Sequence, residues 1–286
     1  MSEGQGAEAP WPAPAKLNLM LRVVGRRDDG YHLLQTLFQF IDLCDELRFE
    51  PRLDGGIRLL TGTPGVPAQA DLVVRAAHLL QQHTGCGLGA NIRIHKRLPL
   101  GGGLGGGSSD AATTLVALNQ LWRTGVGDDD LAALGLRLGA DVPVFVRGRS
   151  AWGEGVGEEL QPVDPARPWY LVLKPECHVP TSEIFADPEL TRDSCRITIA
   201  DFIAGADRND CLPVVRKRYP LVERALEWLS RHGEPRLTGT GACVFAAFEH
   251  ASGARMALRS VPADIDAFVA RGLNRSPLLD RLSLDR

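Results

Sequence analysis

The segment between residues 99 and 107 reads PLGGGLGGG, with six glycines in nine positions, and leads into a helix-forming stretch at 111–121. Glycine loses more backbone freedom on folding than any other residue, so this density indicates that the main chain must approach another group closely. The start of a helix presents unpaired N–H groups and the positive end of the helix dipole. The sequence therefore predicts a phosphate-binding loop, with Ser108 or Ser109 capping the helix and Asp110 in its first turn.

Two common phosphate motifs fit this loop poorly. Gly101, Gly103 and Gly106 match G-x-G-x-x-G, but that fingerprint directly follows a buried parallel strand, and the preceding segment 91–96 alternates apolar and polar residues. The Gly-Lys-Ser/Thr of a P-loop is absent from the sequence here. A flexible loop without a ligand is the remaining alternative, and the sharp helix start argues against it.

Length and composition exclude several classes of protein. A chain of 286 residues with 44% hydrophobic residues can form one large domain or two tightly joined ones. A formal charge of -3 without a basic stripe argues against a nucleic acid partner. No apolar run reaches the ~18 residues that span a bilayer, so no membrane association is expected. Six cysteines without C-x-x-C spacing indicate buried thiols in a reducing compartment, and hence a cytoplasmic protein. We expect residues 1–10 to form a disordered tail.

Hydrophobic periodicity predicts a mixed architecture. Segment 14–24 is predicted to be a strand with Lys16 and Asn18 on the same side. An Asp54-Gly55 hairpin is expected, and the helix at 219–232 is predicted to turn Leu221 inward. Strands in runs with helices between them favour an α+β fold, divided near residue 153 into domains 1–153 and 154–286. Further strands are expected at 36–43, 46–51, 56–60, 91–96, 169–174 and 243–248, and further helices at 71–85 and 128–138.

Five stretches together resemble the GHMP kinases, a superfamily that includes galactokinase, homoserine kinase, mevalonate kinase and phosphomevalonate kinase. They are residues 14–19, 29–32, 96–112, 139–143 and 239–243. The Lys16-x-Asn18 and Gly30-Tyr31-His32 motifs are most similar to the branch that acts on a cytidine-diphosphate-linked methylerythritol in non-mevalonate isoprenoid biosynthesis. The resemblance implies a two-domain α+β fold with the active site in the cleft between the domains.

The resemblance also implies the reaction and the nucleotide site. The γ-phosphate of ATP would pass to the 2-hydroxyl of the methylerythritol moiety. Mg²⁺ is expected to arrive with ATP, because no acidic or histidine cluster has metal-ligand spacing. The predicted ATP-binding residues are Lys96, Pro99, Leu100, Gly101, Gly102, Gly103, Leu104, Gly105, Gly106, Gly107, Ser108 and Ser109. For the two serines, a role as helix caps alone is the alternative.

Phosphoryl transfer to a hydroxyl requires a base to take its proton, and Asp141 is the candidate. The alternative for Asp141 is a helix N-cap before Val142-Pro143. Lys16 is the second catalytic candidate, since it would hold the carboxylate in its charged form and orient the acceptor. The alternative for Lys16 is an exposed lysine on a strand. Asn18, two residues further on the same side, could hold a substrate oxygen.

The resemblance places the cytosine ring at Tyr31 and His32, with the tyrosine stacking on the ring and the histidine bonding to its edge. Thr181 and Phe185 lie four residues apart on a predicted helical turn and could close the cytidine pocket. The alternatives are a core tyrosine with a capping histidine, and a cap with a core phenylalanine. Rival functions are a kinase of the same superfamily acting on another small alcohol, a nucleotide-binding protein without catalysis, and a dehydrogenase.

Overall fold

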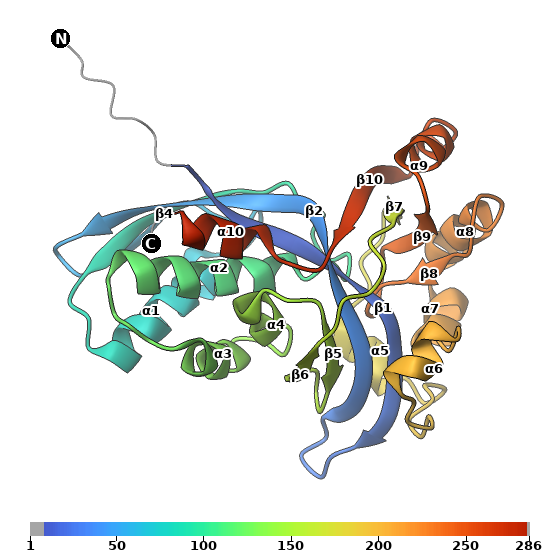
Figure 1. The fold of residues 1–286 in the computed structure, drawn as a ribbon, viewed down its shortest axis with the longest axis horizontal. Coiled ribbons are helices and arrows are strands. Elements are labelled where there is room, and N and C mark those ends of the chain that lie inside the picture. Colours follow the sequence, from blue (N-terminus) through green and yellow to red (C-terminus); the bar gives the residue numbers. More distant parts are fainter. Residues whose placement is uncertain (1–8, 285–286) are drawn as a thin grey trace.

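The computed structural model describes residues 9–284, so the predicted tail at 1–10 lies outside the described residues apart from Ala9 and Pro10. Helices α1 to α4 cover one face of the strands in the N-terminal half, and α8 and α9 flank the strands of the C-terminal half (Figure 1). No helix in the described part is long and apolar enough to cross a membrane. The helices are α1 (Leu72–Thr84), α2 (Gly106–Leu121), α3 (Asp128–Leu136), α4 (Val142–Arg147), α5 (Thr181–Ala186), α6 (Ile199–Ile203), α7 (Leu212–Arg218), α8 (Pro220–Leu229), α9 (Ala251–Leu258) and α10 (Pro277–Ser283).

A long antiparallel hairpin forms the spine of the molecule and carries the site. β1 and β2 pair along almost their whole lengths, and β2 continues through the position where the sequence predicted a break between two strands. That break is absent because β2 is also paired with β4 on its other edge from Glu46 onward. The strands are β1 (Trp11–Arg26), β2 (His32–Arg52), β3 (Ile57–Thr61), β4 (Gly89–His95), β5 (Ala151–Glu154), β6 (Glu159–Pro162), β7 (Trp169–Lys174), β8 (Arg236–Leu237), β9 (Val244–Phe248) and β10 (Asp266–Leu273).

The predicted Asp54-Gly55 hairpin is wrong. A turn does form there, with Asp54 Oδ1 accepting from the N–H of Gly56 at 3.1 Å. After the turn, however, β3 pairs in parallel with β4 rather than returning along β2. Helix α1 provides the crossover that parallel strands require. Its predicted start is confirmed, since the side chain of Asp71 accepts from Val73 N, and Gly85 ends the helix in the left-handed conformation.

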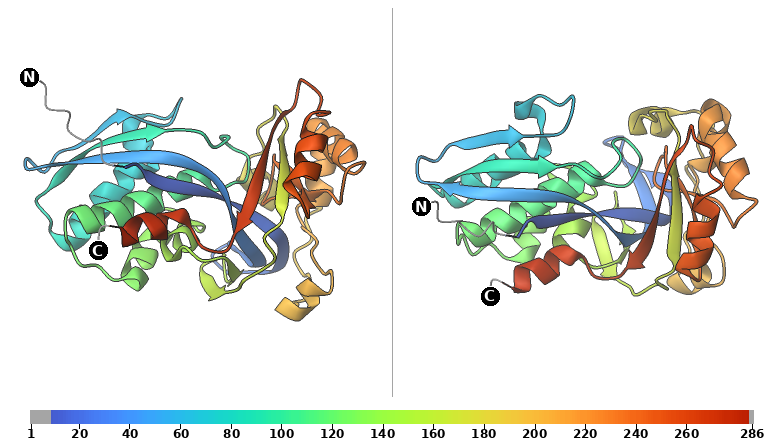
Figure 2. Two further views of the ribbon diagram at one scale, coloured as in Figure 1. Left: turned by 45° about the horizontal axis from the view of Figure 1, so that its top comes forward. Right: turned by 90° about the horizontal axis from the view of Figure 1, so that it is seen from above.

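The C-terminal segment ties the two halves together. β10 pairs with β7 along its length and with β2 through Gly272 and Leu273. The chain then enters α10, which contacts β1 and α2, and both views of Figure 2 show this return of the C-terminus to the N-terminal helices. The division into 1–153 and 154–286 stays a prediction, and residues 277–283 pack on N-terminal elements.

Three local predictions need correction. Helix α2 begins at Gly106, with left-handed Gly105 as its cap, so Ser108 and Ser109 lie inside the first turns and do not cap it. Leu221 is 44% exposed, because α8 begins at Pro220 and turns Val222 inward instead. The six cysteines are all free, yet they are not uniformly buried: Cys211 and Cys243 are buried, three are half-buried and Cys195 is exposed.

Candidate active site

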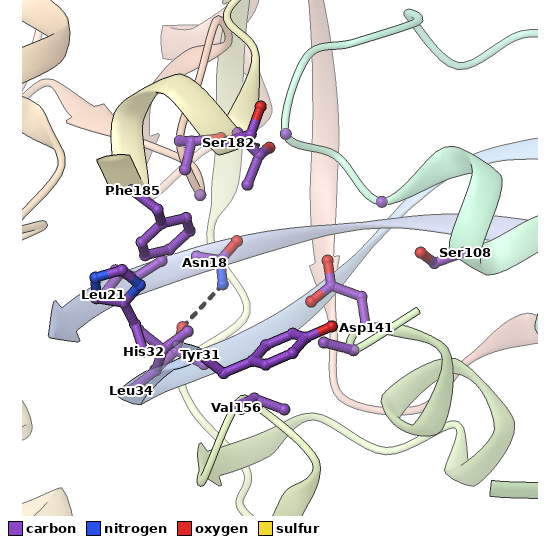
Figure 3. Close-up of a pocket in the computed structure, with 18 of the residues that line it drawn as sticks. Asn18, Leu21, Tyr31, His32, Leu34, Ser108, Asp141, Val156, Ser182 and Phe185 are labelled. Atoms are coloured by element: carbon purple, nitrogen blue, oxygen red, sulfur yellow. Dashed lines mark hydrogen bonds between the residues drawn. The ribbon is translucent and has the colours of Figure 1, made fainter. Parts of the chain in front are cut away.

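A cavity of about 750 Å³ lies between the β1–β2 hairpin, the start of α2 and the start of α5. Figure 3 shows Asp141 and Ser108 at one end and His32 and Phe185 at the other, with Asn18 and Tyr31 between them. Segments far apart in the sequence therefore meet in one site. Its lining includes Lys16, Asn18, Tyr31, His32, Thr36, Phe38, Gly103, Gly105, Ser108, Asp141, Val156, Thr181, Phe185, Gly239 and Thr240.

Lys16 is buried, with only 3% of its surface exposed, so the alternative of an exposed strand lysine is wrong. The glycine loop covers this side of β1, because the N–H of Lys16 donates to Leu104 O at 3.0 Å. The Lys16 ammonium donates to Asn18 Oδ1 at 2.5 Å and Gly103 O at 3.1 Å, and forms an ion pair with Asp141 Oδ2 at 3.2 Å. A buried ammonium with these partners has a fixed position at the cavity wall.

Asp141 occupies the N-cap position of α4, but its side chain makes no capping hydrogen bond. The carboxylate faces Lys16 instead and remains one-third exposed toward the cavity. The two catalytic candidates, 125 positions apart in the sequence, are thus brought together. The carboxylate geometry is that of a base with one orienting partner and an open side for a ligand.

Asn18 is held on both sides of its amide. Its Oδ1 accepts from Lys16, and its Nδ2 donates to Thr36 Oγ1 at 2.8 Å. Thr36 in turn donates to Met20 O at 2.7 Å. The structure therefore assigns Asn18 a clear part in positioning Lys16, and its direct contact with a substrate oxygen stays a prediction.

The glycine loop is clamped between β1 and the turn at 238–243. Cys243 N donates to Gly102 O at 3.2 Å, and Thr238 Oγ1 donates to Gly103 O at 3.3 Å. Gly103 has a φ of +75°, and a Cβ there would lie 2.4 Å from Thr238 O. Glycine is therefore required at this position because the turn at 238–243 packs against it. The sequence had indicated a different reason, which was close approach of a phosphate to the main chain.

The packing of the glycine loop against the turn at 238–243 predicts different effects on stability for alanine substitutions at two glycines of the loop. Gly103→Ala should destabilise the fold by about 1–3 kcal/mol or more, because it adds left-handed strain to a clash with a backbone carbonyl. Gly106→Ala should be tolerated, since a Cβ there would make only ordinary contacts of 3.5 Å with Leu98 and Lys96. Urea unfolding of both variants measures the difference. Gly105 is a poor choice for probing phosphate contact, because a Cβ there would lie 2.8 Å from the Phe145 ring.

Beneath the start of α2, Lys96 is enclosed by two buried carboxylates. Its ammonium forms an ion pair with Asp110 Oδ2 at 2.7 Å and a shorter one with Asp45 Oδ2. Asp45 Oδ1 also accepts from the backbone N–H of Leu98 at 2.8 Å. Asp110 is therefore a buried partner of Lys96. Its predicted place in the first turn of the helix is wrong, because α2 begins at Gly106 and has no acidic residue in its first turn. The nucleotide contact of Lys96 stays a prediction. Its ammonium lies beneath the start of α2, where it can support this end of the helix.

The buried ion pair of Lys96 and Asp110 predicts that the free energy of unfolding depends on pH. Burial raises the pKa of Asp110 to about 7, Lys96 opposes the rise, and Asp45 adds to it. The folded protein therefore retains a proton that the unfolded chain has lost, so stability should fall as pH rises from about 4 to about 7, by ~1.4 kcal/mol for each unit of pKa difference. Urea unfolding from pH 5 to 8 should show a flatter profile for Asp110→Asn, and an unchanged one for the exposed Asp266→Asn. Parallel profiles for Asp110→Asn and the wild type would contradict this.

At the other end of the cavity, an aromatic group surrounds an open space. The rings of His32 and Phe185 stack with centroids 5.0 Å apart, and Tyr31 is 64% exposed, so the alternative of a core tyrosine is wrong. Thr181 Oγ1 lies 3.0 Å from Thr240 Oγ1. Burial, then the charges of Arg192 and Arg26, lower the pKa of His32. All four residues predicted for the cytidine pocket line this one cavity.

Several residues of the site escaped the sequence analysis. Thr36 and Phe38 lie on β2 and face the cavity opposite Asn18. Thr240 belongs to the second glycine turn, at 238–243; its residues 239–243 carry part of the resemblance, but the sequence assigns them no role. Arg192 contacts His32 from 160 positions away, and no periodicity or motif marks it in the sequence.

The comparisons with known proteins agree with this geometry. The family models described as GHMP kinases N terminal domain and GHMP kinases C terminal match residues 71–149 and 191–266. A relative from Nitrosococcus oceani, called 4-diphosphocytidyl-2-C-methyl-D-erythritol kinase, is 59% identical and covers 95% of this chain and 97% of its own. The chain belongs to the 4-diphosphocytidyl-2-C-methyl-D-erythritol kinase family. Membership of this family confirms the resemblance and excludes a dehydrogenase.

Solved structures support the same assignment. A crystal structure called 4-(cytidine 5'-diphospho)-2C-methyl-D-erythritol kinase is 33% identical, with a TM-score of 0.80 over 92% of this chain and 98% of its own. A mevalonate kinase, 17% identical, matches with a TM-score of 0.68 over 93% and 99% of the two chains, and shows the shared fold alone. The predicted α+β GHMP kinase fold is confirmed. The chain is a kinase, and membership of this family implies ATP as its co-substrate.

Proposed function

We propose that this chain transfers the γ-phosphate of ATP to the 2-hydroxyl of 4-diphosphocytidyl-2-C-methyl-D-erythritol, in the cytoplasm, as a step of non-mevalonate isoprenoid precursor biosynthesis. One observation carries the proposal. A single cavity joins the Lys16–Asp141 pair and the start of α2 to the aromatic group at Tyr31, His32 and Phe185. A substrate with a reacting alcohol at one end and a flat base at the other fits such a cavity.

The mechanism follows from the positions of the side chains. Asp141 takes the proton of the acceptor hydroxyl, the freed oxygen forms a bond to the γ-phosphorus, and the bond from that phosphorus to the bridging oxygen of ADP breaks. Lys16 holds the carboxylate in place and stabilises negative charge on the transferred group. In the part of the chain that the structure describes, the first helical bond of α2 runs from Ser109 N to Gly105 O, which leaves the N–H groups before Ser109 to hold phosphate oxygens.

Mg²⁺ belongs to this proposal as a partner of ATP. Among residues 9–284, no group of three or more His, Cys, Asp or Glu side chains could hold a metal ion. Mg²⁺ keeps several waters and is commonly bound by substrate phosphates with one or two protein oxygens. Ser108, which faces the cavity, fits that role. When bound, the ion neutralises charge on the phosphates.

Recognition of the base would come from the aromatic end. The exposed Tyr31 ring can stack on a base without first leaving a packed core, and Phe185 provides a second apolar surface. His32 contributes hydrogen bonds to the base edge. Thr181 and Thr240, bonded to each other at the cavity wall, can bind the ribose or diphosphate oxygens.

The test is ATP turnover with three acceptors on the full chain. Coupled ADP detection, with the product identified by ³¹P NMR, should show phosphorylation of 4-diphosphocytidyl-2-C-methyl-D-erythritol. The truncated acceptor 2-C-methyl-D-erythritol 4-phosphate keeps the alcohol but lacks the base, and should lose kcat/KM by at least about 10²-fold, because remote binding energy assists the reaction. Mevalonate is the control acceptor. Equal turnover with mevalonate, or with the truncated acceptor, would contradict the proposed substrate.

A further inference from the structure

Arg192 binds the ring of His32 and is itself firmly held. Its Nε donates to His32 Nε2 at 3.1 Å. The two terminal nitrogens donate to three backbone carbonyls, Leu190 O at 3.1 Å, Phe185 O at 2.9 Å and Asp187 O at 2.7 Å. These bonds fix the guanidinium between the end of α5 and the histidine. Arginine has donors only, so every one of these contacts needs an acceptor opposite it.

This contact determines where His32 carries its proton. A guanidinium donor requires an unprotonated nitrogen, so Nε2 is the acceptor and the single proton of a neutral imidazole lies on Nδ1. The lowered pKa of His32, caused by burial and then by the charges of Arg192 and Arg26, keeps the ring neutral near pH 7. Stacking on Phe185 holds the ring plane.

The other ring nitrogen is available to a ligand. Within residues 9–284, no hydrogen bond joins Nδ1 of His32 to the protein, and His32 lines the cavity beside Tyr31 and Phe185. In Figure 3 the two nitrogens of the ring lie on opposite sides, one of them toward Asn18 and Tyr31. The Nδ1–H of His32 thus remains as a donor for a ligand at the aromatic end of the cavity.

We propose that Arg192 is a positioning residue that sets the base specificity of the site by holding His32 as its Nδ1–H tautomer. The proposal rests on the cytidine recognition proposed above. Atom N3 of cytosine is an acceptor and pairs with Nδ1–H, whereas N3 of uracil carries a hydrogen and faces the same donor without a partner. A donor that becomes buried without a partner weakens binding, so the uracil base is disfavoured.

Removing Arg192 has a consequence that a purely structural role would not produce. Without a donor at Nε2, the neutral ring can place its proton there and offer Nδ1 as an acceptor. That acceptor pairs with N3–H of uracil. The variant should therefore gain activity on the uridine analogue of the substrate, while general loosening of the loop would weaken both analogues together.

The first experiment compares kcat/KM for the cytidine and uridine analogues in Arg192→Met and wild type, because methionine has no hydrogen-bond donor to offer His32 Nε2. The cytidine-to-uridine ratio should fall by at least about 10-fold, partly through a gain on uridine, the direction expected when an unpaired donor is relieved. Arg218→Met is the matched control, since Arg218 binds Asp187 Oδ2 at 3.0 Å and supports the same loop without touching His32. Its ratio should be that of the wild type. In a His32→Ala background, Arg192→Met should leave the ratio unchanged.

The second experiment reads the tautomer without any substrate. Nitrogen-15 NMR of the imidazoles in the full chain, assigned with His32→Ala, should show Nδ1 protonated and Nε2 unprotonated in the wild type, and a tautomer mixture in Arg192→Met. Arg192→Ala also removes every donor at Nε2, so it should show the mixture as well and serves if Arg192→Met folds poorly. A wild-type Nε2–H ring, or an unchanged base ratio in a folded variant, would overturn the role of Arg192. A wild type without preference for cytidine, but with Nδ1–H, would instead overturn the proposed substrate.

Discussion

Replacing Asp141 by Asn should lower kcat by about 10²–10⁴-fold with little change in the KM for either substrate, the scale of a lost general base. The amide is the same size as the carboxylate and can still lie beside Lys16, but it cannot accept the proton of the acceptor hydroxyl. Steady-state kinetics at saturating ATP measure the loss. Because Asp141 makes no capping hydrogen bond, the substitution removes no side-chain cap from α4.

Further variants distinguish a loss of catalysis from other causes of reduced turnover. Asp128→Asn, at the exposed start of the neighbouring helix α3, changes a helix-terminal acid that does not line the cavity and should retain wild-type turnover. Lys16→Met keeps most of the buried volume and should lose turnover as well. If the pair acts as one unit, the double variant should be little worse than either single variant. Near-native turnover of Asp141→Asn would reduce this residue to a helix-terminal position without a role in proton transfer.

The second large effect concerns the base. The uridine analogue should be phosphorylated at least about 10²-fold less efficiently than the cytidine substrate, because a site built on hydrogen bonds leaves its groups unpaired against the wrong base. Tyr31→Ala should reduce kcat/KM for both analogues alike, by roughly 1–3 kcal/mol, since stacking does not depend on the base edge. His32→Ala should instead reduce the difference in kcat/KM between the cytidine and uridine analogues. The measurement is kcat/KM for both analogues on the three proteins.

Stability measurements provide the control for this comparison. Tyr31 is 64% exposed, so Tyr31→Ala should unfold at nearly the same urea concentration as the wild type. His32→Ala removes a stacked ring and an arginine contact, and its unfolding must be measured before its kinetics are compared. Equal efficiency on both bases in the wild type would leave a kinase of this family with an unidentified acceptor specificity.

Much of the fold was readable from local pattern. The helix after Asp71 was predicted together with both of its ends, because an N-cap aspartate and a left-handed glycine act within one turn of the chain. The strand 169–174 was predicted at its observed bounds for a similar reason, as a short apolar run between turn signals. The prediction divided β2 into two strands, at 36–43 and 46–51. Pairing with β1 and β4 keeps that segment extended.

The residues of the candidate site likewise include some that the sequence identified and some that it did not. Lys16, Asp141 and the residues of the glycine loop were identified from short motifs and from the resemblance that those motifs carry. The structure brings Lys16 and Asp141 to one cavity, together with Gly103, Gly105 and Ser108 of the loop. Their catalytic and binding roles remain predictions for the experiments above. Arg192 could not be found in this manner, since its identity matters only through His32, which no spacing in the sequence connects to it.

The sequence by itself determined three local features: a glycine loop that leads into a helix, an earlier strand that carries Lys16, and a later glycine turn at 238–243. Each of these features depends on residues within a few positions of one another along the chain. Tertiary structure alone decided what these segments face. It buried Lys16 against Asp141, enclosed Lys96 between Asp45 and Asp110, and moved the helix start to Gly106. The physical reason is that charges and hydrogen-bonding groups, once removed from water, must find partners wherever the packed chain brings them.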